Sequence, residues 1–156
     1  MNDEPQDPET FNNSKDDSPR ISPTQLCQLI NDHSEFKNIF IIDCRSETEY
    51  KGGHIKGSIN ISSPNDKNVI SNLYHEIWKP KTLYIFHCEF SLFRGPTGWS
   101  YFNEEHSKSV NKDLPLHAFV LNGGYREFHA KYPEQCDGGY VSEAKAFIES
   151  VKLRKV

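Results

Sequence analysis

Long apolar runs and an excess of positive charge are both missing from this sequence. None of its apolar runs is long enough to span a membrane, and its acidic, polar start does not resemble a signal peptide. The formal net charge of the 156 residues is -4, so no basic surface for nucleic acid is expected. We therefore expect a protein of the cytoplasm or nucleus that binds neither membranes nor nucleic acid.

Closely spaced cysteines are also missing. The four cysteines are far apart and form no Cys-x-x-Cys pair, which argues against a structural zinc site. An even number of cysteines is compatible with disulfides only in an oxidising compartment. Because the sequence shows no export signal, we place the protein in a reducing one.

Apolar residues are scarce for a compact domain. They make up 35% of the chain, and the mean hydropathy is -0.72, which indicates that part of the chain lies outside the fold. Residues 1–20 are rich in Asp, Glu, Asn, Ser and Pro, with Phe11 as the only large apolar side chain. We predict a disordered acidic tail over residues 1–20 and a single domain over residues 21–156.

The most informative stretch of the sequence is residues 83–96. Residues 83–86 are apolar and predict a buried strand, which ends in His87 and Cys88. Five residues separate Cys88 from Arg94, and a loop of that length can curl around one phosphate-sized anion with its N–H groups pointing inward. The predicted phosphate-binding loop consists of Glu89, Phe90, Ser91, Leu92, Phe93 and Arg94.

The residues around Cys88 predict a cysteine-dependent phosphatase. Arg94 can grip two phosphate oxygens, and a helix starting near Gly95 adds partial positive charge at the same point. Such surroundings favour a thiolate, which attacks phosphorus to form a phosphocysteine that water then hydrolyses. The loop and Arg94 supply the positive field, so neither a metal nor another cofactor is expected. The alternative is a buried structural cysteine beside an unrelated arginine.

The source of the proton for the leaving group stays open in the sequence. Glu89 is the carboxylate inside the loop and is a candidate general acid. It fits equally well a solvated rim position or a contact to a protein substrate, and a monoprotonated phosphate can carry its own proton. For His87 we favour a role in ordering the loop by hydrogen bonding over proton transfer.

A second polar cluster follows another predicted strand. Residues 39–42 form an apolar run that ends in Asp43, Cys44 and Arg45, and Ser46 then suits the start of a short helix. We expect Asp43 and Arg45 to form a structural ion pair. Further helices are predicted near residues 23–31, 69–78, 98–105 and 141–151, and another strand at residues 117–121. This alternation predicts an α/β fold, a central parallel sheet with helices on both faces.

Several motifs together resemble the rhodanese-type catalytic domain of the M-phase inducer phosphatases. The resemblance covers roughly residues 21–136. The matching residues are Asp43-Cys44-Arg45, Glu49-Tyr50, Gly52-Gly53-His54-Ile55-Lys56-Gly57, Ile59-Asn60, His87-Cys88-Glu89-Phe90-Ser91, Arg94-Gly95-Pro96, Leu121, Gly123-Gly124-Tyr125 and Glu127-Phe128.

This resemblance implies a specific activity. Members of that family are dual-specificity phosphatases that remove phosphate from tyrosine and threonine of cyclin-dependent kinases and so promote entry into mitosis. We accordingly expect a monomer whose partner is such a phosphorylated kinase. The resemblance also implies that Cys44 can form a disulfide with Cys88 and protect it from irreversible oxidation; a buried, inert cysteine is the alternative. Glu49, Tyr50 and His54 are expected to be structural.

Three positions depart from the family pattern. Leu92 and Phe93 stand where these phosphatases carry small or acidic residues, and Thr97 replaces a basic residue. The departures leave two alternatives open: an arsenate reductase of the same fold, and a catalytically silent domain that binds phosphoproteins. The presence of both Cys88 and Arg94 argues against the silent domain. A sulfurtransferase is disfavoured, because those relatives generally have a shorter loop.

Overall fold

The computed structural model describes residues 16–32 and 35–154. Residues 1–15, most of the predicted tail, lie outside the described residues. The last part of that predicted tail does contact the domain: Ser18 is buried and Arg20 belongs to the first strand. Within the described ranges, no helix is both long and apolar enough to cross a membrane.

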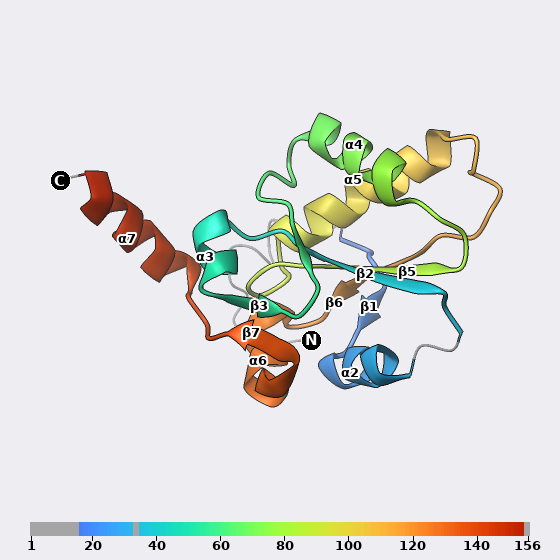
Figure 1. The fold of residues 1–156 in the computed structure, drawn as a ribbon. Helices are drawn as coiled ribbons and strands as arrows, with labels where there is room; N and C mark the ends of the chain where they lie inside the picture. Colours follow the sequence, from blue (N-terminus) through green and yellow to red (C-terminus); the bar gives the residue numbers. More distant parts are fainter. Residues whose placement is uncertain (1–15, 33–34, 155–156) are drawn as a thin grey trace, which may run out of the picture.

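A five-stranded parallel sheet forms the centre of the molecule, in the order β1-β6-β5-β2-β4, and a two-stranded antiparallel sheet pairs β3 with β7 (Figure 1). The strands are β1 (Arg20–Ile21), β2 (Asn38–Asp43), β3 (Gly53–Ile55), β4 (Ile59–Asn60), β5 (Thr82–His87), β6 (His117–Leu121) and β7 (Cys136–Gly138). The helices are α2 (Pro23–Asn31), α3 (Glu47–Lys51), α4 (Lys67–Ile77), α5 (Arg94–Lys108), α6 (Gly124–Lys131), a 3-10 turn (Pro133–Gln135) and α7 (Glu143–Arg154).

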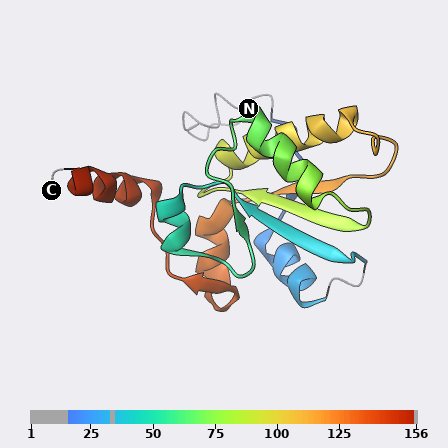
Figure 2. The ribbon, with the colours of Figure 1, turned by 45° about the horizontal axis from the view of Figure 1, so that its top comes forward.

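Helices cover both faces of the parallel sheet, which confirms the predicted α/β fold. Helices α4 and α5 lie on one face, and α2 and α6 lie on the other (Figures 1 and 2). All six residues of β5 are buried, and residues 83–86 alternate between two cores. Tyr84 and Phe86 pack with α4 and α5, whereas Leu83 and Ile85 pack with α2 and α6. Strand β5 is therefore the buried centre from which the 88–94 loop emerges.

Two helices, α2 and α3, begin at serine caps, of which Ser46 was predicted. Ser22 accepts a hydrogen bond from the backbone of Gln25 at 3.0 Å, and the Gln25 side chain accepts one from the Ser22 amide at 2.9 Å. Ser46 forms the same reciprocal capping box with Glu49. Each cap satisfies amides that the first turn of a helix leaves unpaired, and so fixes where α2 and α3 begin.

The region after α6 is more regular than the sequence suggests. Residues 132–140, for which the sequence predicts no helix or strand, contain the 3-10 turn and β7, which pairs with β3. No strand signal is visible in the sequence here, because the pairing is only three residues long and runs through Gly53 and Gly138. Helix α7 then extends away from the body of the domain (Figure 2), with Phe147 and Ile148 exposed.

Candidate active site

The sulfur of Cys88 lies at the junction of β5 and α5. The Gly95 amide donates a hydrogen bond to Cys88 Sγ at 3.2 Å, and the side chain of Cys88 is buried. Only glycine fits at position 95, because a Cβ there would lie 3.0 Å from the backbone of His87. The amino end of the 15-residue helix α5 thus meets the sulfur directly, so the partial positive charge of the helix end is directed at it.

The amino end of α6 holds the first two carbonyl groups of the 88–94 loop. The amide of Tyr125 donates to the carbonyl of Cys88 at 2.9 Å, and the amide of Arg126 donates to that of Glu89 at 3.0 Å. Gly124 makes this approach possible: its φ is +64°, and a Cβ there would lie 2.4 Å from the Glu89 oxygen. The Gly-Gly pair of the sequence is therefore part of the site.

Ser91 forms the turn of the loop. It is buried and adopts a left-handed conformation with φ of 57°. Its hydroxyl accepts the Cys88 amide at 3.4 Å, and its carbonyl accepts a hydrogen bond from the Arg20 guanidinium at 2.9 Å. The loop carbonyls thus point toward donors outside the loop. Because each peptide is planar and trans, the N–H groups that follow them point the opposite way, as a nest for an anion requires.

His87 lies where a loop-ordering residue is expected. It is fully buried, and its Nδ1 lies 3.1 Å from the carbonyl of Cys88, an acceptor, so this nitrogen carries the donated proton. Burial lowers the pKa of His87, although the charge of Asp43 opposes this. A neutral His87 that holds the Cys88 carbonyl fits the predicted role, which stays a prediction.

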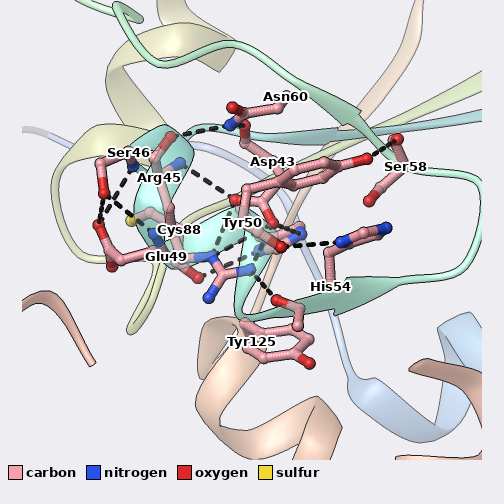
Figure 3. Close-up of polar contacts among 12 residues, drawn as sticks. Asp43, Arg45, Ser46, Glu49, Tyr50, His54, Ser58, Asn60, Cys88 and Tyr125 are labelled. Carbon is pink, nitrogen blue, oxygen red and sulfur yellow. Dashed lines mark hydrogen bonds and ion pairs between the residues drawn. The ribbon is translucent and has the colours of Figure 1, made fainter. Parts of the chain in front are cut away.

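Arg94 is held by Glu49, a residue expected to be structural. Its guanidinium makes two bonds to the carboxylate of Glu49, at 2.7 and 3.2 Å, and Glu143 lies 3.7 Å away. Burial alone would lower the pKa of Arg94, but the hydrogen bonds to Glu49 raise it, so the group stays charged. Glu49 also forms the capping box at the start of α3 (Glu49 is labelled in Figure 3). Its contact with Arg94, which orients the guanidinium, joins residues 45 positions apart and is not visible in the sequence.

Glu89 is buried and held by hydrogen bonds in this arrangement, and its role as general acid stays a prediction. Its side chain is 3% exposed, and both carboxylate oxygens accept hydrogen bonds, one from the hydroxyl of Tyr140 and one from the amide of Glu143 at 3.1 Å. The loop carboxylate therefore anchors the start of α7. The solvated rim position considered above does not fit this burial.

Cys44 lies beside the loop at the end of the neighbouring strand. Asp43 pairs with His87 in the sheet register, and the amide of Cys44 donates to the His87 carbonyl at 2.7 Å, so Cys44 and Cys88 follow paired positions. Both cysteines are free thiols in one buried cluster. Burial, with the nearby Cys88 and Asp43, raises the pKa of Cys44 well above its ordinary value. The structure brings the two cysteines together; their pairing stays a prediction.

The predicted ion pair between Asp43 and Arg45 is confirmed, and it lies next to His87 in the sheet. The two charged groups meet at 2.7 Å with no exposure of either side chain, and Arg45 also donates to the Gly53 carbonyl at 2.7 Å (Figure 3). The Arg45 guanidinium lies 4.1 Å from the centre of the Tyr125 ring. This network ties the end of β2 to the start of α6.

An open groove of about 440 Å³ lies beside Arg94. Two of the departures from the family pattern face it, because Phe93 and Thr97 are among its lining residues. Phe93 is 39% exposed, so a substrate can contact its ring. Among the described residues, no three His, Cys, Asp or Glu side chains are placed to share a metal ion.

Comparisons with known proteins identify the family of this domain. The family model of the rhodanese-like domain matches residues 22–131. An M-phase inducer phosphatase from Dictyostelium discoideum is 37% identical over 110 residues, covering 66% of this chain and 10% of that protein. M-phase inducer phosphatase 2 from Homo sapiens is 34% identical over 141 residues, covering 83% of this chain and 23% of that protein. The chain thus spans less than a quarter of these two relatives.

Solved structures share the fold. A yeast protein tyrosine phosphatase of the rhodanese family superposes with a TM-score of 0.65 at 22% identity, covering 82% of this chain and 97% of that one. The As-Sb reductase from Leishmania major gives a TM-score of 0.63 at 23% identity, covering 83% and 90%. The chain therefore belongs to the rhodanese-like domain family and is distantly related to the part of the M-phase inducer phosphatases that it matches.

Proposed function

We propose that this domain is a cysteine-dependent protein phosphatase that hydrolyses phosphotyrosine and phosphothreonine. The observation that carries the proposal is the outward orientation of the carbonyls of Cys88, Glu89 and Ser91, each bonded to a donor outside the loop. A loop built in this way presents its amides to a tetrahedral anion directly in front of a sulfur. Arg94 completes the cradle from the helix that follows.

The proposed reaction has two displacements at phosphorus. In the first, the Cys88 thiolate forms an S–P bond while the P–O bond to the substrate breaks, and the leaving oxygen takes up a proton. In the second, water forms a new P–O bond, the S–P bond breaks, and the thiolate returns with release of inorganic phosphate. The loop amides and Arg94 stabilise the equatorial oxygens, where charge gathers in both transition states.

The leaving-group proton has two candidate sources. Glu89 is the first, but its two oxygens already accept bonds from Tyr140 and Glu143. The second is the phosphate monoanion of the substrate itself. The contacts of Glu89 favour the phosphate monoanion, and Glu89 then contributes by holding the loop and the start of α7 together.

A cyclin-dependent kinase is the proposed protein substrate. The support is the identity of 34–37% shared with the two M-phase inducer phosphatases over the aligned region. Phosphate removal from such a kinase would place the domain in the control of cell division, at entry into mitosis. The exposed rings of Phe90 and Phe93 at the rim give a protein substrate an apolar surface to contact.

The test is hydrolysis of an aryl phosphate by the reduced protein, with arsenate reduction by a thiol-coupled assay in parallel. Cys88→Ser should abolish phosphate release, whereas Cys44→Ser, a buried matched control, should retain it. Arsenate reduction with negligible phosphatase activity would replace the proposal by the reductase. Silence in both assays, with retained binding of a phosphopeptide, would favour the silent binding domain. An active enzyme would next be assayed on phosphorylated cyclin-dependent kinase.

A further inference from the structure

Arg20 reaches the 88–94 loop from the far edge of the sheet. Its backbone is fixed, because Arg20 pairs with Val120 in register and the flanking bonds, Val120 to Pro19 at 2.9 Å and Asn122 to Ile21 at 2.8 Å, are both formed. Its side chain is 29% exposed, so most of it packs against the protein. The predicted domain boundary at residue 21 would place Arg20 outside the domain.

The guanidinium of Arg20 makes two separate bonds. Nη1 donates to the carbonyl of Ser91 at 2.9 Å, and Nη2 donates to the carboxylate of Asp16 at 2.6 Å. One planar group thus joins the amino-terminal segment to the turn of the loop, across 71 positions of sequence. The fork of an arginine holds both acceptors at once in fixed directions.

Ser91 is the loop residue whose orientation most needs external support. Its φ of 57° lies in the left-handed region, which is unfavourable for a serine. If the peptide after Ser91 rotated by half a turn, its carbonyl oxygen would turn away from Arg20 and toward the inside of the loop. The carbonyls of Cys88 and Glu89 are held by backbone amides of α6, whereas that of Ser91 is held by a side chain.

We propose that Arg20 is a positioning residue for oxyanion binding, which acts through the Ser91 carbonyl to hold the turn of the loop in its left-handed conformation. The inference deepens the proposed function, since it concerns the same loop, but it needs only that the loop binds a tetrahedral oxyanion. Arg20 is separate from Cys88 and Arg94, so it can be changed without altering either of them.

Tungstate binding by calorimetry tests the proposal on wild type, Arg20→Gln and Lys51→Gln. Lys51 is a matched control: it is 72% exposed on α3, and its replacement removes the same charge. We expect Arg20→Gln to weaken tungstate binding about tenfold, as loss of a bond from a charged donor predicts, and to lower kcat/KM for an aryl phosphate by a similar factor. Lys51→Gln should leave both unchanged. Thermal unfolding should show that each variant is folded.

A purely structural role for Arg20 predicts a different result. The unfolding midpoint of Arg20→Gln would fall, while the tungstate affinity of the folded protein would equal that of wild type, and this would overturn the inference. Wild type that binds no tungstate would overturn both the inference and the phosphatase proposal. Wild type that binds tungstate in an Arg20-dependent way, yet hydrolyses no aryl phosphate, would support the inference and contradict the phosphatase proposal alone.

Discussion

Two neighbouring strands of the sheet end in a cysteine, and the two cysteines lie in opposite environments. Cys44 follows β2 and Cys88 follows β5, at positions that the register of the two strands places side by side. Cys88 accepts the Gly95 amide and faces Arg94. Cys44 is buried against α5, where a Cβ on Gly98 would lie 3.0 Å from its sulfur, and burial raises its pKa.

The difference shows that the segment after each strand decides the chemistry of its cysteine. After β5 the chain makes an open turn and starts a 15-residue helix aimed at the sulfur. After β2 it makes a tight turn into the five-residue helix α3, and the buried ion pair of Asp43 with Arg45 lies on either side of Cys44 in the sequence. The first arrangement favours a nucleophile, and the second favours a neutral thiol.

The bond between Arg94 and Glu49 joins the two helices that follow these strands, α5 and α3, and breaking it should have the largest effect. Arg94→Met should lower kcat/KM for an aryl phosphate by about 10²-fold or more, because a charged donor to the transition state is lost. It should also destabilise the protein by about 3 kcal/mol, since the fully buried Glu49 carboxylate loses its partner. Steady-state kinetics and urea unfolding measure the two effects.

Glu49→Gln, alone and combined with Arg94→Met, separates the two roles. The amide introduced by Glu49→Gln keeps an oxygen that can accept the Ser46 amide but carries no charge. The double variant should recover most of the stability lost in Arg94→Met and none of its activity. If the double variant were less stable than either single one, Glu49 would not depend on Arg94 for its burial.

Oxidation with hydrogen peroxide tests whether Cys44 protects Cys88 from irreversible oxidation. Hydrogen peroxide should convert the Cys88 thiolate to a sulfenic acid, which the adjacent Cys44 thiol condenses with to form a disulfide and release water. Wild type should then recover most of its activity on reduction with dithiothreitol. Cys44→Ser should progress to sulfinic acid and recover little, as activity assays and intact mass would show. Equal recovery of the two proteins would make Cys44 an inert core residue.

Much of this site follows from the sequence because its signals are local. The apolar strand before Cys88, the spacing to Arg94 and the Asp43-Arg45 pair each lie within a few residues, and the structure places them as expected. The contacts that the sequence does not show are long-range. Arg20 and Ser91 are 71 positions apart, and Arg94 and Glu49 are 45 apart, so only the folded sheet brings them together.

In the fold, too, local features were predictable from the sequence and long-range pairings were not. Capped helices and buried strands were predictable, whereas the pairing of β3 with β7 was not, because it depends on glycines rather than on an apolar pattern. Tyr140 likewise stands in a stretch with no recognisable period, and its contact with Glu89 appears only once β7 has returned the chain to the loop.

Glu89→Gln distinguishes an acid from an anchor at the first loop position. If Glu89 anchors α7, kcat should fall only about threefold to tenfold, in line with the loss of one charge-assisted hydrogen bond, and the shape of the pH profile should persist. Tyr140→Phe should produce a similar loss, because it removes a bond to the same carboxylate. Loss of the basic limb of the pH profile in Glu89→Gln alone would identify Glu89 as the general acid.

The paired positions Asp43 and His87 should give a small dependence of stability on pH. Burial lowers the pKa of His87 below 6.5, so near that pH the unfolded chain binds a proton that the native state does not. The free energy of unfolding should therefore fall as the pH decreases from 7 to 5, by at most about 1.4 kcal/mol per unit for this one proton.

Asp43 affects the free energy of unfolding only at a lower pH than His87 does. Burial raises its pKa while His87 and Arg45 lower it, and the net shift is downward, so its contribution is lost only as the pH falls below 3.8. Urea unfolding at pH 7, 6 and 5 measures the His87 effect, and His87→Gln, which keeps a side-chain donor near the Cys88 carbonyl, is its control. The slope between pH 7 and 5 should be shallower in His87→Gln; an equal slope would assign the dependence to other histidines. A shallower slope would place part of the acid sensitivity of the protein at the strand end that carries the candidate catalytic cysteine.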